Sequence, residues 1–334
     1  MVSAVIFVAT SCVSPLTGFA FWETNLAYEG ESIYNYLQVK NLSDRTILST
    51  NVLFGVQSVT MKDKGLTGMY YDTALAAPAL ADNANSALIL GMGTGTYARQ
   101  LKQYYPKMNI TGVEIDQKIT DLAGEYFDEP ADIPVTTYDG RAWLAASHDK
   151  YDVIMVDAYQ DITIPFQMSS TEFFTMVREH LNPGGVMVVN MNMISDGQGS
   201  INEALSDTIA SVFGNGNTLT ADVPNTTNRE LFAKKPGSGS EENSMQQASK
   251  ALNLRETTYE RTGSEDLEWY MEEVASRFRK VNEPDSASTI LTDDKAPVEV
   301  LGMRAIGQII ADEAGPYRQI LKDEGFGGLL RAVQ

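Results

Sequence analysis

Three acidic residues each stand at or near the end of an expected β-strand. In open α/β sheets, residues at the carboxyl ends of the strands bind ligands. Glu114 ends "NITGVE", Asp139 ends "VTTYD" and Asp157 ends "VIMVD". A carboxylate there can accept hydrogen bonds from two hydroxyl groups or from an amine, or take a proton. We therefore expect a ligand site at the place where these runs end.

A glycine turn precedes Glu114. The stretch "ALILGMGTGTYARQL" places Gly91, Gly93 and Gly95 directly after an apolar run. Glycines let the backbone approach a ligand at the start of a helix, and Glu114 follows at a spacing of about 20 residues. The third glycine comes one residue too early for a dinucleotide fingerprint. We interpret the turn as an adenosyl sulfonium site in which Glu114 accepts both ribose hydroxyls; a tight turn with a solvated acid is the alternative.

The elements that must position these residues alternate regularly between apolar strands and helices. The expected strands are 87–90, 110–115, 133–140, 151–159, 186–191 and 228–235. The expected helices are 96–105, 117–127, 141–147, 170–181 and 202–214, and 183–185 is an expected turn. This alternation predicts a mostly parallel sheet covered on both faces, the arrangement of a Rossmann-like α/β domain.

We expect four parts along the chain. They are an apolar arm or membrane segment (1–22), an N-terminal β unit (23–69), a Rossmann-like cofactor-binding transferase domain (70–235) and a C-terminal helical extension (236–334). Short β-like runs at 33–39, 45–50 and 52–61 predict the antiparallel N-terminal unit, and 70–80 has helical spacing. In the extension we expect a flexible loop at 236–244 and the best helix at 266–281.

The segment Met1–Trp22 contains no charged residue, so it can span a membrane or form a buried apolar arm. Pro15 and Gly18 weaken the membrane interpretation, and the lack of a basic region argues against a secretory signal. Both alternatives stay open. We expect a cytoplasmic protein, tethered to the membrane if this segment spans it.

The amino-acid composition argues against some classes of binding partner and of bound metal. A net charge of −19 argues against a nucleic-acid partner and suits a small cationic substrate, although acidity can serve solubility alone. Cys12 is the one cysteine, and His148 and His180 are the two histidines. We therefore expect no disulfide and no metal site.

Together these motifs resemble the spermidine synthase family, the polyamine aminopropyltransferases. The resemblance is carried by the glycine turn, "VEID", "YDGRAWL", "VDAY", "STEFF", "LNPGGVMVVN", "ESIYNYLQV" and "TGMYYDTAL". It covers roughly residues 30–300 and is specific as an ensemble. "LTDDKAPVEVL", Leu291–Leu301, resembles the tail of spermidine synthase-like domains fused to membrane segments. Within it we interpret Asp293 and Asp294 as a loop or helix-start acid pair.

The resemblance implies the cofactor contacts. Glu114 would hold the ribose of decarboxylated S-adenosylmethionine, and Asp139 with Gly140 would face the adenine. Asn35 stands where the family has a glutamine on the ribose side. Thr94, in the glycine turn, stands where the family usually has an aspartate that binds the aminopropyl ammonium. Because a threonine carries no charge, the choice between decarboxylated and intact S-adenosylmethionine stays open.

The resemblance also implies an acceptor site. Tyr70 matches a tyrosine that lines the amine site, and Asp157 matches the acid that orients and deprotonates the attacking amine. A protonated amine is not a nucleophile, so a carboxylate must take or hold its proton. Gln160, followed by Asp161, occupies the place of a second acid. Asp157 can alternatively cap the next segment, and Tyr70 can be an ordinary half-buried aromatic residue.

Three functions follow from these residues. The first is transfer of an aminopropyl group to a polyamine such as putrescine, by a homodimer that needs no metal. The second is methyl transfer from S-adenosylmethionine to a small molecule, and the third is binding of an adenosyl ligand without turnover. The replaced acids at Thr94 and Gln160 favour the second and third functions.

Overall fold

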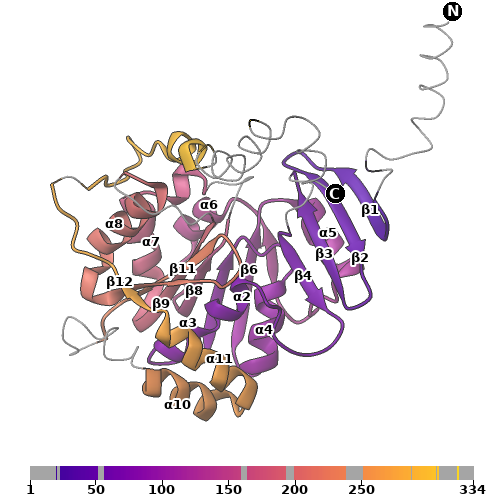
Figure 1. Ribbon diagram of the computed structural model, residues 1–334, viewed down its shortest axis with the longest axis horizontal. Helices are drawn as coiled ribbons and strands as arrows, with labels where there is room; N and C mark the ends of the chain where they lie inside the picture. Colours follow the sequence, from indigo (N-terminus) through magenta and orange to yellow (C-terminus); the bar gives the residue numbers. More distant parts are fainter. Residues whose placement is uncertain are drawn as a thin grey trace, which may run out of the picture.

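The protein is described here by a computed structural model. It describes residues 20, 23–51, 56–158, 164–192, 199–237, 251–286, 288–305, 307 and 322. Within these residues the chain forms a four-stranded antiparallel sheet and an eight-stranded mixed sheet with helices on both faces (Figure 1). The expected Rossmann-like fold with a small N-terminal sheet is confirmed.

The small sheet is formed by β1 (Leu26–Glu31), β2 (Tyr36–Asn41), β3 (Arg45–Thr50) and β4 (Ser58–Met61), in that order. Its buried side chains Leu37, Val39 and Leu48 pack against α5 (Gln117–Tyr126), which joins this sheet to the larger one. The sequence did not predict β1, because its side chains are half-buried or exposed and show no apolar alternation.

The large sheet has the order β12-β10-β11-β9-β8-β5-β6-β7. Its strands are β5 (Ser86–Leu90), β6 (Asn109–Glu114), β7 (Val135–Thr137), β8 (Tyr151–Val156), β9 (Leu181–Asn192), β10 (Thr218–Asp222), β11 (Asn228–Lys234) and β12 (Arg279–Lys280). The five strands from β9 to β7 run parallel, and β11, β10 and β12 add antiparallel strands at one edge. The parallel strands are continuous apolar runs because both sheet faces are covered.

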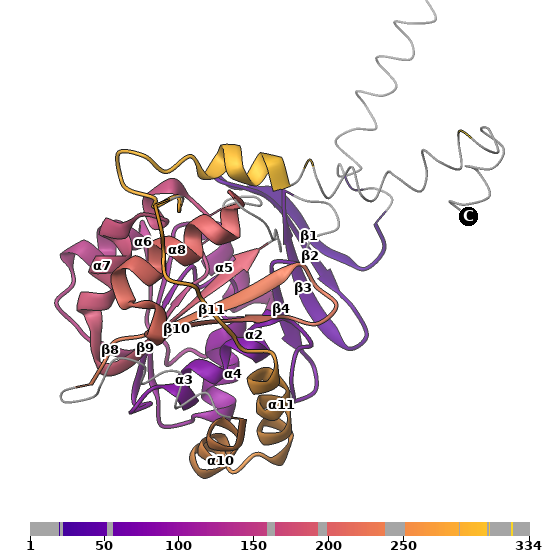
Figure 2. The same cartoon turned by 60° about the vertical axis from the view of Figure 1, so that its left-hand side comes forward.

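Helices cover the two faces with separate cores. Ile89 and Met155 point toward α2 (Tyr70–Ala74), α3 (Ala76–Leu80), α4 (Thr96–Tyr104), α10 (Ala251–Thr262) and α11 (Glu265–Ser276). Leu90 and Val156 point toward α6 (Gly140–Ala146), α7 (Thr171–His180) and α8 (Ile201–Phe213). Figure 2 shows α10 and α11 stacked below the sheet, on the side opposite α7 and α8.

Three expected elements need correction. The helix expected over 266–281 ends at Ser276, and Arg279–Lys280 pairs with β10 as β12. The turn expected at 183–185 is an irregular start of β9, since Tyr151 pairs with Leu181 but Val153 pairs with Val186. The strand β10 was missed. It lies between β11, which follows it in the sequence and pairs with it as a hairpin, and β12, which comes from a distant part of the chain.

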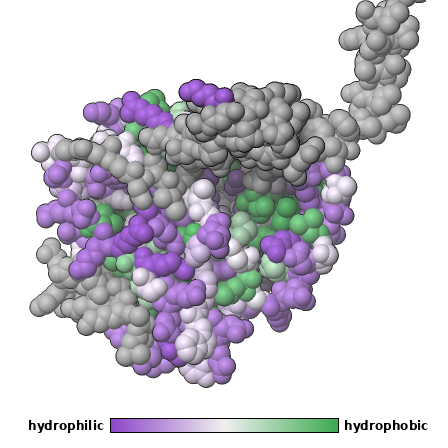
Figure 3. Space-filling model, in the orientation of Figure 1, coloured by the Kyte–Doolittle hydropathy of each residue, from purple (hydrophilic) through white to green (hydrophobic). Residues whose placement is uncertain are grey.

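The ends of the chain are described only in part. Met1–Trp22 lies outside the described residues except for Ala20, and the loop expected at 236–244 is described only at 236 and 237. No helix among the described residues combines the length and apolarity needed to cross a bilayer. Residues 298–305 are helical. The face shown in Figure 3 is mostly hydrophilic where it is coloured, with apolar side chains gathered beside the N-terminal sheet.

Candidate active site

The carboxyl ends of the central strands place one row of residues side by side. Val156 pairs with both Leu90 and Val189, and Leu90 also pairs with Val113. The residues that follow these four, together with Glu230, which pairs with Asn190, form what we name the sheet-edge row: Glu114, Gly91, Asp157, Asn190 and Glu230. Because paired residues project toward the same face of a sheet, the row concentrates three carboxyl groups on one face.

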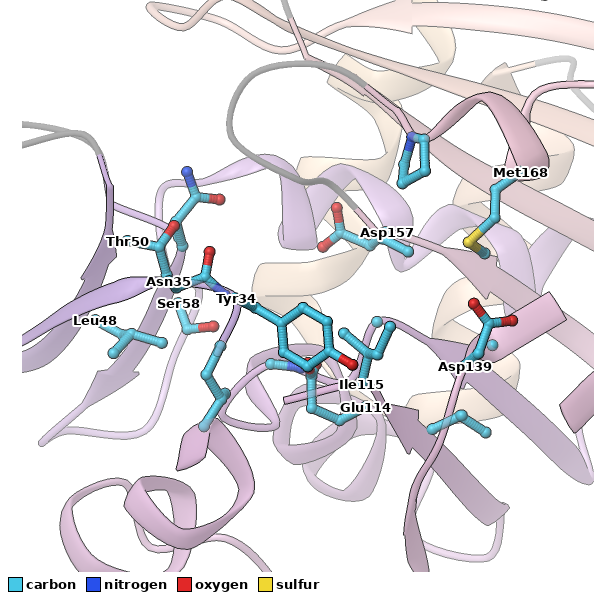
Figure 4. A pocket seen from close by; sticks show the side chains of 18 of the residues that line it. Tyr34, Asn35, Leu48, Thr50, Ser58, Glu114, Ile115, Asp139, Asp157 and Met168 are labelled. Carbon is cyan, nitrogen blue, oxygen red and sulfur yellow. The ribbon is translucent and has the colours of Figure 1, made fainter. Parts of the chain in front are cut away.

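A cavity of about 290 Å³ lies over one half of this row, between the large sheet and the N-terminal sheet (Figure 4). Eight of the predicted site residues line it: Asn35, Tyr70, Gly91, Gly93, Glu114, Asp139, Gly140 and Asp157. Thr94 and Gly95 are not among the lining residues, and Gln160 and Asp161 lie outside the described residues. The structure therefore brings together residues that are separated by up to about 120 positions, as parallel strand edges require.

The glycine turn fits closely against its neighbours. Gly91 has a φ of +87°, and a Cβ atom there would lie 2.3 Å from the carbonyl oxygen of Asp157. A Cβ at Gly93 would lie 2.7 Å from the Ser58 Oγ. No side chain fits at Gly91 without displacing the backbone of Asp157. This glycine is thus required by packing within the protein as well as by any approach of a ligand.

Glu114 is almost fully buried at the end of β6. Its Oε2 accepts a hydrogen bond from the Gly93 N–H at 2.8 Å, and its Oε1 accepts one from the Asp116 N–H at 3.0 Å. Burial raises the pKa of this carboxyl, and the two backbone hydrogen bonds oppose that shift. Each oxygen retains a further lone pair, so the carboxylate can still accept two hydroxyl hydrogen bonds.

The opposite side of the cavity can hold a flat ring. Ile115 and Tyr138 are exposed apolar side chains that line it together with Met168. Asp139 caps α6 by accepting the Ala142 N–H at 2.8 Å on Oδ1. Its Oδ2 accepts no hydrogen bond from the described residues and remains able to bind an amine. This combination of apolar surface and one acceptor suits a purine base.

Asp157 lies at the end of β8 and is held by two side chains. Tyr70 donates its hydroxyl to Asp157 Oδ2 at 2.6 Å, and Asn190 donates its amide to Oδ1 at 3.0 Å. The pKa of Asp157 is raised to about 7, mainly by burial; the two hydrogen bonds oppose this shift, and the negative charge of Glu114 adds to it. A carboxyl with a pKa near neutrality is suited to accept a proton from an amine.

Thr94 lies beneath the cavity instead of lining it. Its side chain is fully buried, and its Oγ1 has no hydrogen-bond partner among the described residues. The Thr94 N–H donates to the Ser58 Oγ at 3.3 Å, and Ser58 does line the cavity. Thr94 thus contacts a cavity-lining residue through its backbone, and contact of its side chain with a cofactor stays a prediction.

Asn35 belongs to a hairpin that covers the cavity. Its Nδ2 donates to Asp116 Oδ2 at 3.1 Å, and its Oδ1 accepts from Asn51 at 2.8 Å. Ser32 donates to the same Asp116 oxygen at 2.5 Å. Asn35 thus fastens the β1–β2 hairpin to the start of α5, and its predicted ribose contact remains untested. The neighbouring Tyr34 extends over the cavity toward Glu114 (Figure 4).

Sequence reasoning missed several cavity residues. They are Tyr34, Leu48, Thr50, Gln57, Ser58, Tyr71, Val113, Ile115, Ile119, Tyr138, Ala158, Pro165, Gln167 and Met168. Ile115, Tyr138 and Ala158 directly follow or precede predicted site residues, so adjacency could have indicated them. Ser58 begins β4 and Gln57 directly precedes it, and the position of this strand over the glycine turn depends on long-range packing. The described residues contain no group of three or more His, Cys, Asp or Glu side chains that could hold a metal ion.

The sheet and the cavity define a Rossmann-like α/β domain with a ligand cavity at the carboxyl ends of its parallel strands. A family model described as "Spermine/spermidine synthase domain" matches residues 69–235, which is half of the chain. The chain belongs to the spermine/spermidine synthase family, as its motifs predicted.

Curated relatives agree with this assignment. The chain is 99% identical over 334 residues to a probable polyamine aminopropyl transferase of Bifidobacterium longum, covering all of this chain and 75% of that protein. It is also 37% identical over 131 residues to a polyamine aminopropyltransferase of Corynebacterium efficiens, covering 36% of this chain and 25% of that one. The likeness to domains fused to membrane segments finds no support in these matches and stays a prediction.

Solved structures show the same fold. A probable spermidine synthase from Corynebacterium glutamicum matches with a TM-score of 0.56 and 22% identity, over 80% of this chain and 99% of that one. A spermidine synthase in complex with the transition state analogue AdoDATO matches with a TM-score of 0.53 and 18% identity, over 63% of this chain and 74% of that one.

Proposed function

We propose that this chain transfers an aminopropyl group from decarboxylated S-adenosylmethionine to a polyamine acceptor such as putrescine. The observation that carries the proposal is Asp157, a carboxyl with a pKa of about 7 at the cavity end of β8. Membership of the spermine/spermidine synthase family supports it.

The cofactor occupies the half of the cavity between Glu114 and Asp139. Glu114 accepts the two ribose hydroxyls, and the backbone donors Gly93 and Asp116 keep its carboxylate oriented. Asp139 Oδ2 accepts the adenine amine while the ring lies against Ile115 and Met168. The adenosyl group thereby directs its sulfonium toward Asp157.

Asp157 carries out the proton transfer. The acceptor ammonium gives one proton to this carboxylate, which the hydroxyl of Tyr70 holds at 2.6 Å. The freed nitrogen lone pair attacks the aminopropyl carbon bound to sulfur, so a C–N bond forms. The C–S bond breaks with its electron pair on sulfur, leaving the neutral thioether methylthioadenosine. Orientation of the amine behind this carbon supplies much of the rate.

The choice of cofactor depends on the tail region below the glycine turn. Thr94 in the turn does not line the cavity, and the cavity residues beside it, Gln57 and Ser58, are uncharged. An ammonium finds hydrogen-bond acceptors in them but no opposite charge. Methyl transfer from intact S-adenosylmethionine is therefore the second candidate, because no acid in the turn repels its carboxylate.

The test measures both products with both cofactors. Purified protein is incubated with putrescine and either decarboxylated or intact S-adenosylmethionine, and methylthioadenosine and S-adenosylhomocysteine are quantified. We expect methylthioadenosine from the decarboxylated cofactor only. S-adenosylhomocysteine as the main product would favour methyl transfer, and neither product with any amine would favour a binding domain. We also propose that the enzyme is a homodimer, which sedimentation would test. We propose further that it is cytoplasmic and that Met1–Trp22 can tether it to the membrane, which membrane fractionation would test.

A further inference from the structure

Asn190, which donates to Asp157 in the site, is itself bound by a side chain that the mechanism above does not use. Asn228, the first residue of β11, donates its Nδ2 to Asn190 Oδ1 at 2.9 Å. Asn190 in turn donates its own Nδ2 to Asp157 Oδ1 at 3.0 Å. The two hydrogen bonds run in the same direction and form a chain from Asn228 through Asn190 to the carboxyl group.

The direction of this chain decides which end of the Asn190 amide faces Asp157. Asn190 is 3% exposed, so its carbonyl oxygen and its amide nitrogen both need hydrogen-bond partners within the protein. The donor of Asn228 binds the carbonyl oxygen, and the amide nitrogen is then directed at Asp157. The reversed amide would place its oxygen against a carboxylate oxygen, and two acceptors form no hydrogen bond with each other.

The backbone holds Asn228 at the place where its side chain reaches Asn190. The Asn228 N–H donates to Thr226 Oγ1 at 3.1 Å, and the Asn228 carbonyl oxygen accepts the Val223 N–H at 3.0 Å. Asn228 also pairs with Asn192 across β11 and β9, two residues after Asn190. Because side chains two residues apart on a strand point to the same face, Asn228 and Asn190 lie on one face of the sheet.

Asp157 depends on neutral donors for its ionised form. The titratable groups of the described residues that interact with it are Tyr70 and Tyr71 on α2, Glu114 on β6 and Glu230 on β11. None of these four groups is a cation. Burial raises the pKa of Asp157, and the hydrogen bonds from Tyr70 and Asn190 lower it. The direction of the Asn190 amide therefore matters for the charge of the carboxyl.

We propose, on the basis of the function proposed above, that Asn228 is a positioning residue for the base of the reaction. It acts through Asn190, because it keeps the amide donor of that residue directed at Asp157. This donor stabilises the carboxylate that accepts the proton of the amine. Asn228 itself does not line the cavity, so its effect on the reaction passes through the hydrogen-bond chain.

The first test follows turnover against pH in Asn228→Ala, which removes the donor, and in Asn228→Asp, which replaces the donor by an acceptor of the same shape. Because only the ionised carboxylate accepts a proton, kcat/KM rises with pH through the pKa of Asp157. Relative to the wild type, we expect the midpoint of this rise to lie about one pH unit higher in Asn228→Ala and higher still in Asn228→Asp. Above about pH 9, Asn228→Ala should recover to within about threefold of the wild type. Thr227→Ala, at the adjacent exposed residue, is the matched control.

The second test measures the carboxyl directly and does not depend on turnover. NMR spectroscopy of protein with isotope-labelled aspartate carboxyl carbons follows the titration of Asp157, whose signal is assigned by its absence from Asp157→Asn. We expect the midpoint at about pH 7 in the wild type and about one pH unit higher in Asn228→Ala.

Three results would overturn the proposal. They are an unchanged midpoint in both Asn228 variants, an equal shift in Thr227→Ala, and a loss of turnover in Asn228→Ala that persists at high pH. Failure of the wild type to release methylthioadenosine with any amine would instead count against the proposed function, and the NMR titration would still decide the role of Asn228.

Discussion

Two aspartates of this protein, Asp157 in the sheet-edge row and Asp293 in the C-terminal segment, have their pKa values shifted in opposite directions. Burial raises that of Asp157 to about 7. Hydrogen bonds from Arg141 and then Ser170 lower that of Asp293 to about 2. Asp157 has neutral donors around it, whereas Asp293 has a guanidinium. The presence of a cationic partner thus separates a carboxyl that can exchange a proton from one that stays ionised.

Asp293 has a structural role, because two neighbouring side chains donate hydrogen bonds to its carboxylate. Arg141 donates to its Oδ1 at 2.7 Å and to its Oδ2 at 2.6 Å, and Ser170 donates to Oδ1 at 2.5 Å. Arg141 also donates to the carbonyl oxygen of Gln167, which lines the cavity. The C-terminal segment is thereby tied to the adenine side of the site. Asp293 lies between the paired residues 292 and 295, consistent with its interpretation as a loop acid.

The largest expected effect separates the two aspartates by turnover. Asp157→Asn should lower kcat by about 100- to 10,000-fold, because no group is left to take the amine proton. Binding of methylthioadenosine should change less than about twofold, since Asp157 acts on the acceptor. Methylthioadenosine release and calorimetry measure the two quantities, and Asp293→Asn is the control. Turnover retained in Asp157→Asn would remove the distinction between the two carboxyls.

The second effect concerns stability against pH. The pKa of Asp157 is about 7 in the folded protein and near 3.8 in the unfolded chain. The contribution of Asp157 to the free energy of unfolding is therefore fully present below pH 4 and is lost as pH rises through 7. At pH 8 Asp157→Asn should therefore be more stable than the wild type by about 2–4 kcal/mol. The two proteins should be nearly equal at pH 4. Urea unfolding at both values measures this, and the opposite trend would contradict the raised pKa.

The third effect tests Glu114, another buried carboxyl of the row. Glu114→Gln should weaken methylthioadenosine by about 1.5–3 kcal/mol, because charge-assisted hydrogen bonds to the ribose are lost. The kcat at saturating cofactor should fall much less than in Asp157→Asn. Isothermal titration supplies the affinity. Unchanged binding would show that Glu114 does not hold the ribose and that its burial is purely structural.

The smallest effect is expected at Asp293. Its pKa is depressed, so its stabilising contribution is present above pH 4 and is lost as pH falls toward 2. The side chain is 41% exposed, so solvent screening limits the loss in Asp293→Asn at pH 7 to about 1 kcal/mol or less. Asp294→Asn, at the adjacent exposed acid, should have no effect. Thermal unfolding of both variants decides whether the ion pair contributes at all.

The sequence predicted those parts of the site that local pattern determines. Gly91, Glu114 and Asp157 each end an apolar strand, so their common edge follows from the parallel sheet alone. Asn190 and Glu230 could not be found in this way, because Asn190 depends on the shifted register of β9 against β8 and Glu230 on the register of β11 against β9. The same holds for β10 and β12, whose pairing joins distant segments.

The ion pair between Arg141 and Asp293 could not be predicted from local sequence pattern either. The two residues lie 152 positions apart, and neither has a neighbour in sequence that indicates the other. Pattern along the chain predicts which face of an element is buried. It does not predict which charged surface residues meet when two elements pack, since exposed ion pairs add little to the free energy that selects the fold.

The hairpin over the cavity has a consequence for the escape of product. Asp116 accepts hydrogen bonds from Ser32 and Asn35 and also caps α5 through the Lys118 N–H. Lifting the hairpin therefore breaks bonds to a carboxylate that also begins a helix, at about 1.5–3 kcal/mol for each charged hydrogen bond. In the proposed reaction, methylthioadenosine has to leave a site whose cover is held by the residue two positions after Glu114. We expect its release, more than the chemical step, to limit the steady-state rate.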